Sequence, residues 1–244
     1  MVKKLLKKST YRTIKTKLVP FKKIQDEFYD VLYLANSGSS MFIPENLYCI
    51  DYAIRNLATN NPILEIGSFT GMSTNILIHF LQKYKRQNKL FTADKWMFEE
   101  RDRAYYPRVL DKSIQEFSAF IRESFLRNLR FFNGERLPFT IELFSDEFFE
   151  KWRSKAATTD VFGRPVTLGG SFSFCYVDGG HEYEIVKRDF ENIDQFIDTG
   201  GFIFFDDSAS HIESGVREVM KEVIKRKDYE LVIKNPNYLF RKKH

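Results

Sequence analysis

The chain has 244 residues, a formal net charge of +5 and a hydrophobic fraction of 43%, with 25 phenylalanines. This length suits one α/β domain with elaborations, and the apolar content leaves little room for extended disorder. No run of about 18 apolar residues occurs, and no apolar segment follows the basic first ten residues, so we expect neither a transmembrane helix nor a secretory signal. The two cysteines, Cys49 and Cys175, lack metal-ligand spacing, which favours a reduced, cytoplasmic setting.

Much of the positive charge lies at the two ends of the chain. Seven lysines and arginines fall within the first 17 residues, and Arg241, Lys242 and Lys243 close the sequence. Such clusters could contact nucleic acid or acidic lipid, but a solvated basic face is the commoner case. We therefore do not expect nucleic acid as a partner.

Residues 1–60 are predicted to be mainly helical and to cap the main domain. Pro44 is placed to open a second helix in this region. Apolar residues recur at three- and four-residue steps in both helices, namely Leu18, Phe21, Ile24, Phe28 and Val31, then Tyr48, Ile50, Tyr52, Ile54 and Leu57.

Residues 61–94 predict the opening of a doubly wound sheet. A short apolar strand, Ile63–Ile66, leads into a turn from Gly67 to Gly71, and a helix begins near Met72. A second strand, Leu90–Ala93, then ends at Asp94. This order of strand, glycine turn, helix, strand and acidic residue is typical of the first half of a nucleotide-binding sheet.

The rest of the chain is predicted to continue this alternation, with an insertion at about 95–138 that contains the crossover helix. A third strand is expected at residues 139–144, with a helix beginning near Phe148, and residues 158–170 read as a loop. A strand is then expected at Phe172–Val177, and the helix after it should end at Thr199, Gly200 and Gly201. The next strand covers residues 202–205 and is followed by Asp206 and Asp207, and the helix after it is capped by Ser214 or by Ser210 with Glu213. A C-terminal hairpin with strands at residues 229–233 and 238–241 completes the expected elements.

The glycine turn and Asp94 predict a nucleoside-binding site. Glycines after a first strand let the backbone approach a ligand and leave amides free at the helix start. A carboxylate at the end of the next strand can accept hydrogen bonds from ribose hydroxyls. The diphosphate fingerprint is absent because Phe69 and Met72 stand where glycines would be. Glycine turns are also common without any ligand, so this pattern alone decides little.

Asp178, Asp206 and Asp207 predict a divalent-metal site. They follow two strands that are one strand-helix-strand repeat apart. Three carboxylates converging in a cleft repel one another unless a cation lies between them, and oxygen ligands suit Mg²⁺ or Mn²⁺. The alternative is that one or two of these acids cap a helix or face solvent.

His181 is the candidate general base. It lies three residues after Asp178 in a glycine turn, and imidazole suits proton removal near neutral pH. A structural or solvated histidine is the alternative. His211 is a second candidate base, whereas His79 and His244 have no expected role.

The segment L-E-I-G-S-F-T-G-M-S, from Leu64 to Ser73, resembles the first motif of class I S-adenosylmethionine-dependent methyltransferases. The resemblance implies a Rossmann-like fold with a seven-stranded, mostly parallel sheet and an antiparallel last strand. It also implies contacts to S-adenosylmethionine from Glu65, Gly67, Ser68, Gly71, Asp94, Ser145 and Asp178, with Asp146 beside Ser145 near the adenine.

The D-G-G-H and F-F-D-D segments resemble metal-dependent O-methyltransferases that act on small molecules and sugars. In catechol-type members an asparagine follows the strand-five aspartate, whereas Asp207 stands there in this chain. The acid-acid form is similar to the macrolide-sugar enzymes. That resemblance implies Mg²⁺ on Asp178, Asp206 and Asp207, and His181 as the base.

The predicted activity is methyl transfer from S-adenosylmethionine to a hydroxyl of a small molecule or sugar with vicinal oxygens. An RNA methyltransferase and a non-catalytic cofactor-binding scaffold are the two rival hypotheses. Trp96 is a weak candidate for lining a substrate pocket. The sequence leaves open whether the protein forms a homo-oligomer.

Overall fold

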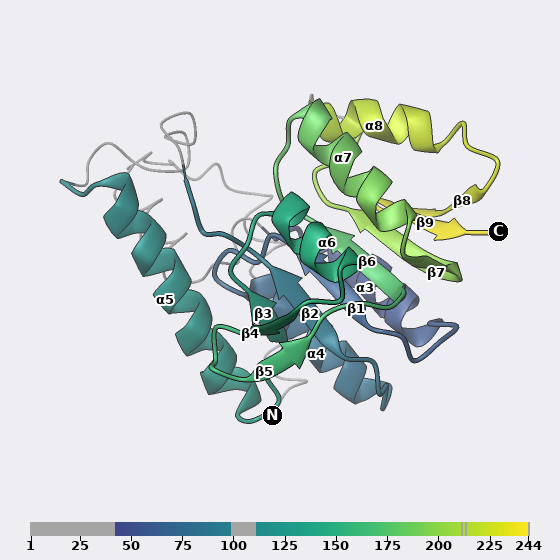
Figure 1. Ribbon diagram of the computed structural model, residues 1–244. Coiled ribbons are helices and arrows are strands. Elements are labelled where there is room, and N and C mark those ends of the chain that lie inside the picture. Colours follow the sequence, from purple (N-terminus) through teal and green to yellow (C-terminus); the bar gives the residue numbers. More distant parts are fainter. Residues whose placement is uncertain (1–41, 99–110, 211, 213, 244) are drawn as a thin grey trace, which may run out of the picture.

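The protein is a three-layer α/β/α sandwich in a computed structural model that describes residues 42–98, 111–210, 212 and 214–243 (Figure 1). Helices α3 (Asn46–Arg55), α4 (Met72–Lys83) and α5 (Ile114–Asn133) pack on one face of the central sheet. Helices α6 (Ser145–Arg153), α7 (Tyr183–Asp194) and α8 (Gly215–Val223) cover the other face. This arrangement confirms the predicted Rossmann-like fold.

The central sheet has seven strands in the order β3-β2-β1-β6-β7-β9-β8. The first five run parallel, and β9 runs antiparallel to both β7 and β8. The strands are β1 (Ile63–Ile66), β2 (Leu90–Ala93), β3 (Phe139–Ile141), β6 (Phe172–Val177), β7 (Ile197–Phe205), β8 (Tyr229–Lys234) and β9 (Tyr238–Lys242). The order reverses at β1 and β6, so their carboxyl ends form the crevice where such sheets bind ligands.

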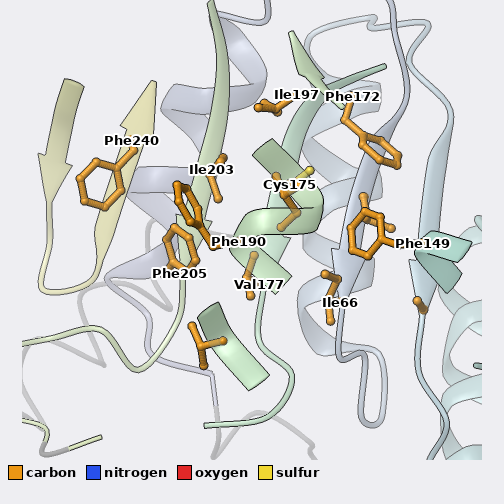
Figure 2. Close-up of a cluster of buried hydrophobic side chains, with 14 of the residues drawn as sticks. Ile66, Phe149, Phe172, Cys175, Val177, Phe190, Ile197, Ile203, Phe205 and Phe240 are labelled. Carbon is orange, nitrogen blue, oxygen red and sulfur yellow. The ribbon is translucent and has the colours of Figure 1, made fainter. Parts of the chain in front are cut away.

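The central strands are buried on both faces, and alternate residues belong to two separate core clusters. On β6, Cys175 and Val177 face the layer of α6, α7 and α8 (Figure 2). Phe174 and Tyr176 face the opposite layer. Because strand side chains alternate between faces, a residue just past a strand still follows this parity unless the backbone turns. By this rule Asp178 and Asp206 both continue the face of Tyr176 and Phe204.

Two predicted strands have different bounds. β3 ends at Ile141 rather than at residue 144, because Leu143 N turns back to bond with Ile141 O at 2.9 Å. β7 begins at Ile197, so Thr199, Gly200 and Gly201 lie within a strand and do not end a helix. The register of β7 against β6 shifts between Phe172 and Phe174, which accommodates the extra residues as a bulge.

The predicted loop at residues 158–170 contains a second, two-stranded sheet. β4 (Ala157–Thr159) pairs antiparallel with β5 (Pro165–Thr167). The buried Asp160 carboxylate holds the turn because it accepts hydrogen bonds from Phe162 N and Arg164 N and pairs with the Arg164 guanidinium. The prediction missed this hairpin because neither strand has an apolar alternation.

The predicted N-terminal cap is described only from residue 42. Its second helix, α3, packs directly on α4 and β7, and buries Cys49, Ile50 and Ile54. Tyr48, expected in the apolar stripe, is instead exposed. The predicted first helix, His211 and Glu213 lie outside the described residues. Ser214 caps α8 as expected, since its side chain accepts from Arg217 N. Over the described residues, no helix is long and apolar enough to cross a membrane.

Candidate active site

Most of the predicted site residues lie at the carboxyl edge of the sheet. Gly67 follows β1, Asp94 follows β2, Asp178 follows β6 and Asp206 follows β7. Phe69, Trp96 and Asp207, which are not glycines, adopt positive φ angles of 44°, 47° and 51° in the turns at this edge. Left-handed backbone is costly for such residues and concentrates at functional sites.

The turn after β1 packs directly on the end of β6. Gly67 has φ +80°, and a Cβ placed on it would lie 2.0 Å from the backbone oxygen of Asp178. Only glycine therefore fits at this position. The glycine turn and the Asp178–His181 segment thus form one continuous surface.

Asp94 clamps the glycine turn. Its Oδ2 accepts hydrogen bonds from Ser68 N at 2.7 Å and Phe69 N at 2.9 Å. Its Oδ1 accepts from Trp96 N at 2.6 Å. The Trp96 indole in turn donates to Phe69 O at 2.8 Å and is buried, so Trp96 supports the turn and does not line a pocket. Burial raises the pKa of Asp94, and the amide donors oppose that rise.

Glu65 lies beneath the glycine turn as predicted. Its Oε2 accepts hydrogen bonds from Ser68 Oγ at 3.1 Å and from Thr74 Oγ1 at 2.5 Å. Its Oε1 is buried and has no hydrogen-bond partner among the described residues. Burial raises the pKa of Glu65 to about 7. A buried, unpartnered carboxylate oxygen next to a glycine turn fits a cationic ligand group, such as an ammonium.

Asp178, His181 and Asp207 come together as a cluster that can hold a cation. One ligand atom from each lies within 4.8 Å of the others, and all three side chains are half-buried. His181 Nε2 lies 3.3 Å from Asp207 Oδ2. Burial, and then the neighbouring carboxylates of Asp206 and Asp207, raise the pKa of Asp178 well above its usual range. A divalent cation among these groups would offset that repulsion.

Asp206, the third predicted ligand, is not part of this cluster. It is buried, and it continues the face of β7 on which Phe204 packs towards α3. Both of its oxygens accept hydrogen bonds from neighbouring side chains. Oδ1 accepts from Asn46 and Asn237, and Oδ2 accepts from Asn46 and Tyr176. The side chain of Asp206 is therefore held by these partners, whereas the left-handed turn at Asp207 directs the next carboxylate to His181.

Ser145 and Asp146, the predicted adenine contacts, open α6 at the same edge of the sheet. Asp146 forms an ion pair with Arg188 at 3.5 Å. Asp189 on α7 is buried, and burial raises its pKa to about 6, an effect that the polar Ser145 side chain opposes. The structure thus places these residues beside the cleft, and their contact with adenine stays a prediction.

The sequence analysis missed the glycine that lets α8 approach His181. Gly215 N donates to His181 O at 3.0 Å. A Cβ on Gly215 would lie 2.0 Å from Tyr183 N, so no larger residue fits. The sequence offers no signal for this role, because the two segments meet only in the folded chain. Asn46, Tyr176 and Asn237 were missed for the same reason.

The comparisons with known proteins identify the family. Residues 64–208, more than half of the chain, match a family described as a methyltransferase domain. The chain belongs to this methyltransferase family. It is an S-adenosylmethionine-dependent methyltransferase, and the matched segment contains the glycine turn, Asp94 and the Asp178–His181–Asp207 cluster. No curated protein sequence matches the chain.

Solved methyltransferase structures share the fold at low sequence identity. The O-methyltransferase NovP has a TM-score of 0.53 and 15% identity, covering 82% of this methyltransferase and 79% of NovP. TomG from Streptomyces achromogenes, an O-methyltransferase involved in tomaymycin synthesis and solved with S-adenosylmethionine, has a TM-score of 0.53 and 13% identity over 95% of both chains. The Podospora anserina methyltransferase PaMTH1 has a TM-score of 0.54 and 12% identity, covering 97% and 96%.

Proposed function

We propose that this methyltransferase acts on a hydroxyl of a small molecule or sugar that carries vicinal oxygens, with a divalent metal, Mg²⁺ or Mn²⁺, and His181 as general base. The observation that supports the proposal best is the Asp178–His181–Asp207 cluster, which adjoins the glycine turn. NovP and TomG are O-methyltransferases, which agrees with transfer to oxygen.

The cofactor fits the groups that line the crevice. S-adenosylmethionine supplies an electrophilic methyl group, which is bonded to its positively charged sulfonium sulfur. Its ammonium matches the unpartnered Glu65 Oε1, and Gly67 and Gly71, at φ +80° and +88°, give the turn the shape along which its methionine part would lie. Asp94 is assigned to the ribose, since its Oδ1 keeps a lone pair beyond the bond from Trp96 N, whereas Oδ2 already accepts from Ser68 N and Phe69 N.

The metal is assigned to two carboxylates, Asp178 and Asp207. Oxygen donors suit Mg²⁺ and Mn²⁺, whereas imidazole is more typical of zinc, copper and iron. His181 is therefore left to take the proton of the acceptor hydroxyl. A bound divalent cation would make that hydroxyl easier to ionise.

The catalytic roles are tested with labelled S-adenosylmethionine, a panel of catechols and sugar diols, and added Mg²⁺. We expect His181→Ala to lower kcat by about 100-fold or more, the usual contribution of a general base. His79→Ala, a histidine exposed on α4, is the matched control and should keep full activity. Asp207→Asn should raise the Mg²⁺ concentration required for activity.

Two results would contradict the proposal. If His181→Ala and Asp207→Asn both keep wild-type turnover, the metal and base assignment is wrong. If the enzyme methylates a structured RNA and none of the small acceptors, the acceptor class is wrong.

A further inference from the structure

Asp206 is the centre of a buried polar network that joins three distant parts of the chain. Asn46 Nδ2, at the start of α3, lies 3.0 Å from each Asp206 oxygen. Tyr176 OH, on β6, donates to Oδ2 at 2.7 Å. Asn237 Nδ2, in the turn between β8 and β9, donates to Oδ1. All four side chains are almost fully buried.

The two asparagines have no freedom to reorient. Asn237 Nδ2 also donates to Asn46 Oδ1 at 3.1 Å, and Asn237 Oδ1 accepts from Ala209 N at 2.9 Å. Asn237 therefore bonds to both ends of the turn at residues 206–209. Since each amide oxygen and nitrogen has a partner of the opposite kind, flipping either side chain would break at least two bonds.

The network fixes the backbone that carries Asp207. Asp206 Oδ1 also accepts from Asp207 N at 2.9 Å. This bond holds Asp207 at φ +51°, a conformation that costs about 1 kcal/mol or more for a residue with a side chain. The Asp207 backbone oxygen accepts from Ser214 Oγ at 3.2 Å, which ties the turn to α8. The result is an Asp207 carboxylate that faces His181.

We propose that Asn46, Tyr176 and Asn237 are positioning residues for the metal site and act through Asp206 on Asp207. Asp206 is thus a second-layer group and not a ligand. Residues that orient a ligand typically change metal affinity about 10- to 100-fold when they are removed. The inference rests on the metal assignment made under the proposed function, and it extends the site beyond residues 64–208, where the family match ends.

The test measures Mn²⁺ binding and S-adenosylhomocysteine binding separately, by calorimetry, in the full chain. We expect Asn46→Ala, Asn237→Ala and Tyr176→Phe to weaken Mn²⁺ binding by about 10-fold or more. Their affinity for S-adenosylhomocysteine should change far less, since Asn46 and Asn237 form no hydrogen bond with Glu65, Gly67 or Asp94, and Tyr176→Phe removes only a hydroxyl from the strand neighbour of Glu65. Tyr176→Phe keeps the buried ring, so at least one variant is expected to fold.

Asn61→Ala is the matched control. Asn61 Nδ2 donates to both oxygens of Asp198, at 3.1 and 2.8 Å, but at the amino edge of the sheet. Its removal should lower stability without changing Mn²⁺ affinity. If the folded variants of Asn46, Tyr176 and Asn237 keep wild-type Mn²⁺ affinity, this inference is wrong, but the metal assignment still stands. A wild-type protein that binds S-adenosylhomocysteine but not Mn²⁺ would overturn the metal assignment and this inference together, and would leave the methyltransferase assignment standing.

Discussion

At the scale of single residues, Glu65 gives the sharpest pH dependence. Its pKa of about 7 lies above its ordinary value of 4.5, because the side chain is buried. Between these pH values the folded protein holds a proton that the unfolded chain has released. The free energy of unfolding contributed by this group therefore falls as pH rises from 4.5 to 7.

Cofactor binding should release that proton. The ammonium of S-adenosylhomocysteine favours the ionised form of Glu65, so calorimetry near pH 6 in buffers of different ionisation enthalpy should show proton release. Glu65→Gln should remove the release and weaken binding. Equal proton release by wild type and Glu65→Gln would show that another group titrates.

Asp206 and Asp207 show what could be predicted at this scale. The residue types and their place after a strand predicted an acidic site, and Asp178, His181 and Asp207 do meet. Which of the two adjacent acids reaches the site depends on the buried partners that hold Asp206 and on the positive φ of Asp207. The sequence shows neither a left-handed aspartate nor Asn46, which lies 160 positions before its partner.

At the scale of elements, the β1–α4 turn depends on Gly67. Gly67→Ala should lower the free energy of unfolding by several kcal/mol, roughly 2–4, because the new Cβ meets the Asp178 backbone oxygen and the backbone cannot move away. It should also abolish cofactor binding. Urea unfolding and calorimetry measure both effects.

Gly163→Ala is the control for that prediction. Gly163 has a similar φ of +82°, but nothing lies within 4 Å of the position its Cβ would take. Only the left-handed strain remains, so the cost should be about 1 kcal/mol. Equal costs for the two variants would mean that the close approach at Gly67 adds nothing.

Secondary structure was predictable where apolar periodicity was strong. The strands Ile63–Ile66, Leu90–Ala93 and Phe172–Val177 have the predicted bounds, because each is a continuous apolar run between turn signals. Prediction failed where tertiary contacts decide, as at residues 199–201, where the pairings of Ile197 and Phe202 with β6 flank a bulge that contains two glycines. The β4–β5 hairpin likewise depends on the Asp160 carboxylate.

At the scale of the whole molecule, the family segment should not fold alone. A fragment of residues 64–208 lacks α3, which covers Phe202 and Phe204. It also lacks α8, which packs in the opposite layer, and the β8–β9 pair, of which β9 bonds to β7. We expect it to show no cooperative urea transition and no S-adenosylhomocysteine binding, in contrast to the full chain. A cooperative transition in the fragment would contradict this view.

The Asp206 network also has a consequence for the order in which the protein assembles. The clamp on the glycine turn joins Ser68 to Asp94, only 26 positions apart. The bond between Asn237 and Asn46 spans 191 positions. Closing the longer loop costs more entropy, so the bond between Asn237 and Asn46 should form later in folding than the clamp. A folding chain can thus close its glycine turn before its acidic turn, so the metal side of the site should be the last part to be completed.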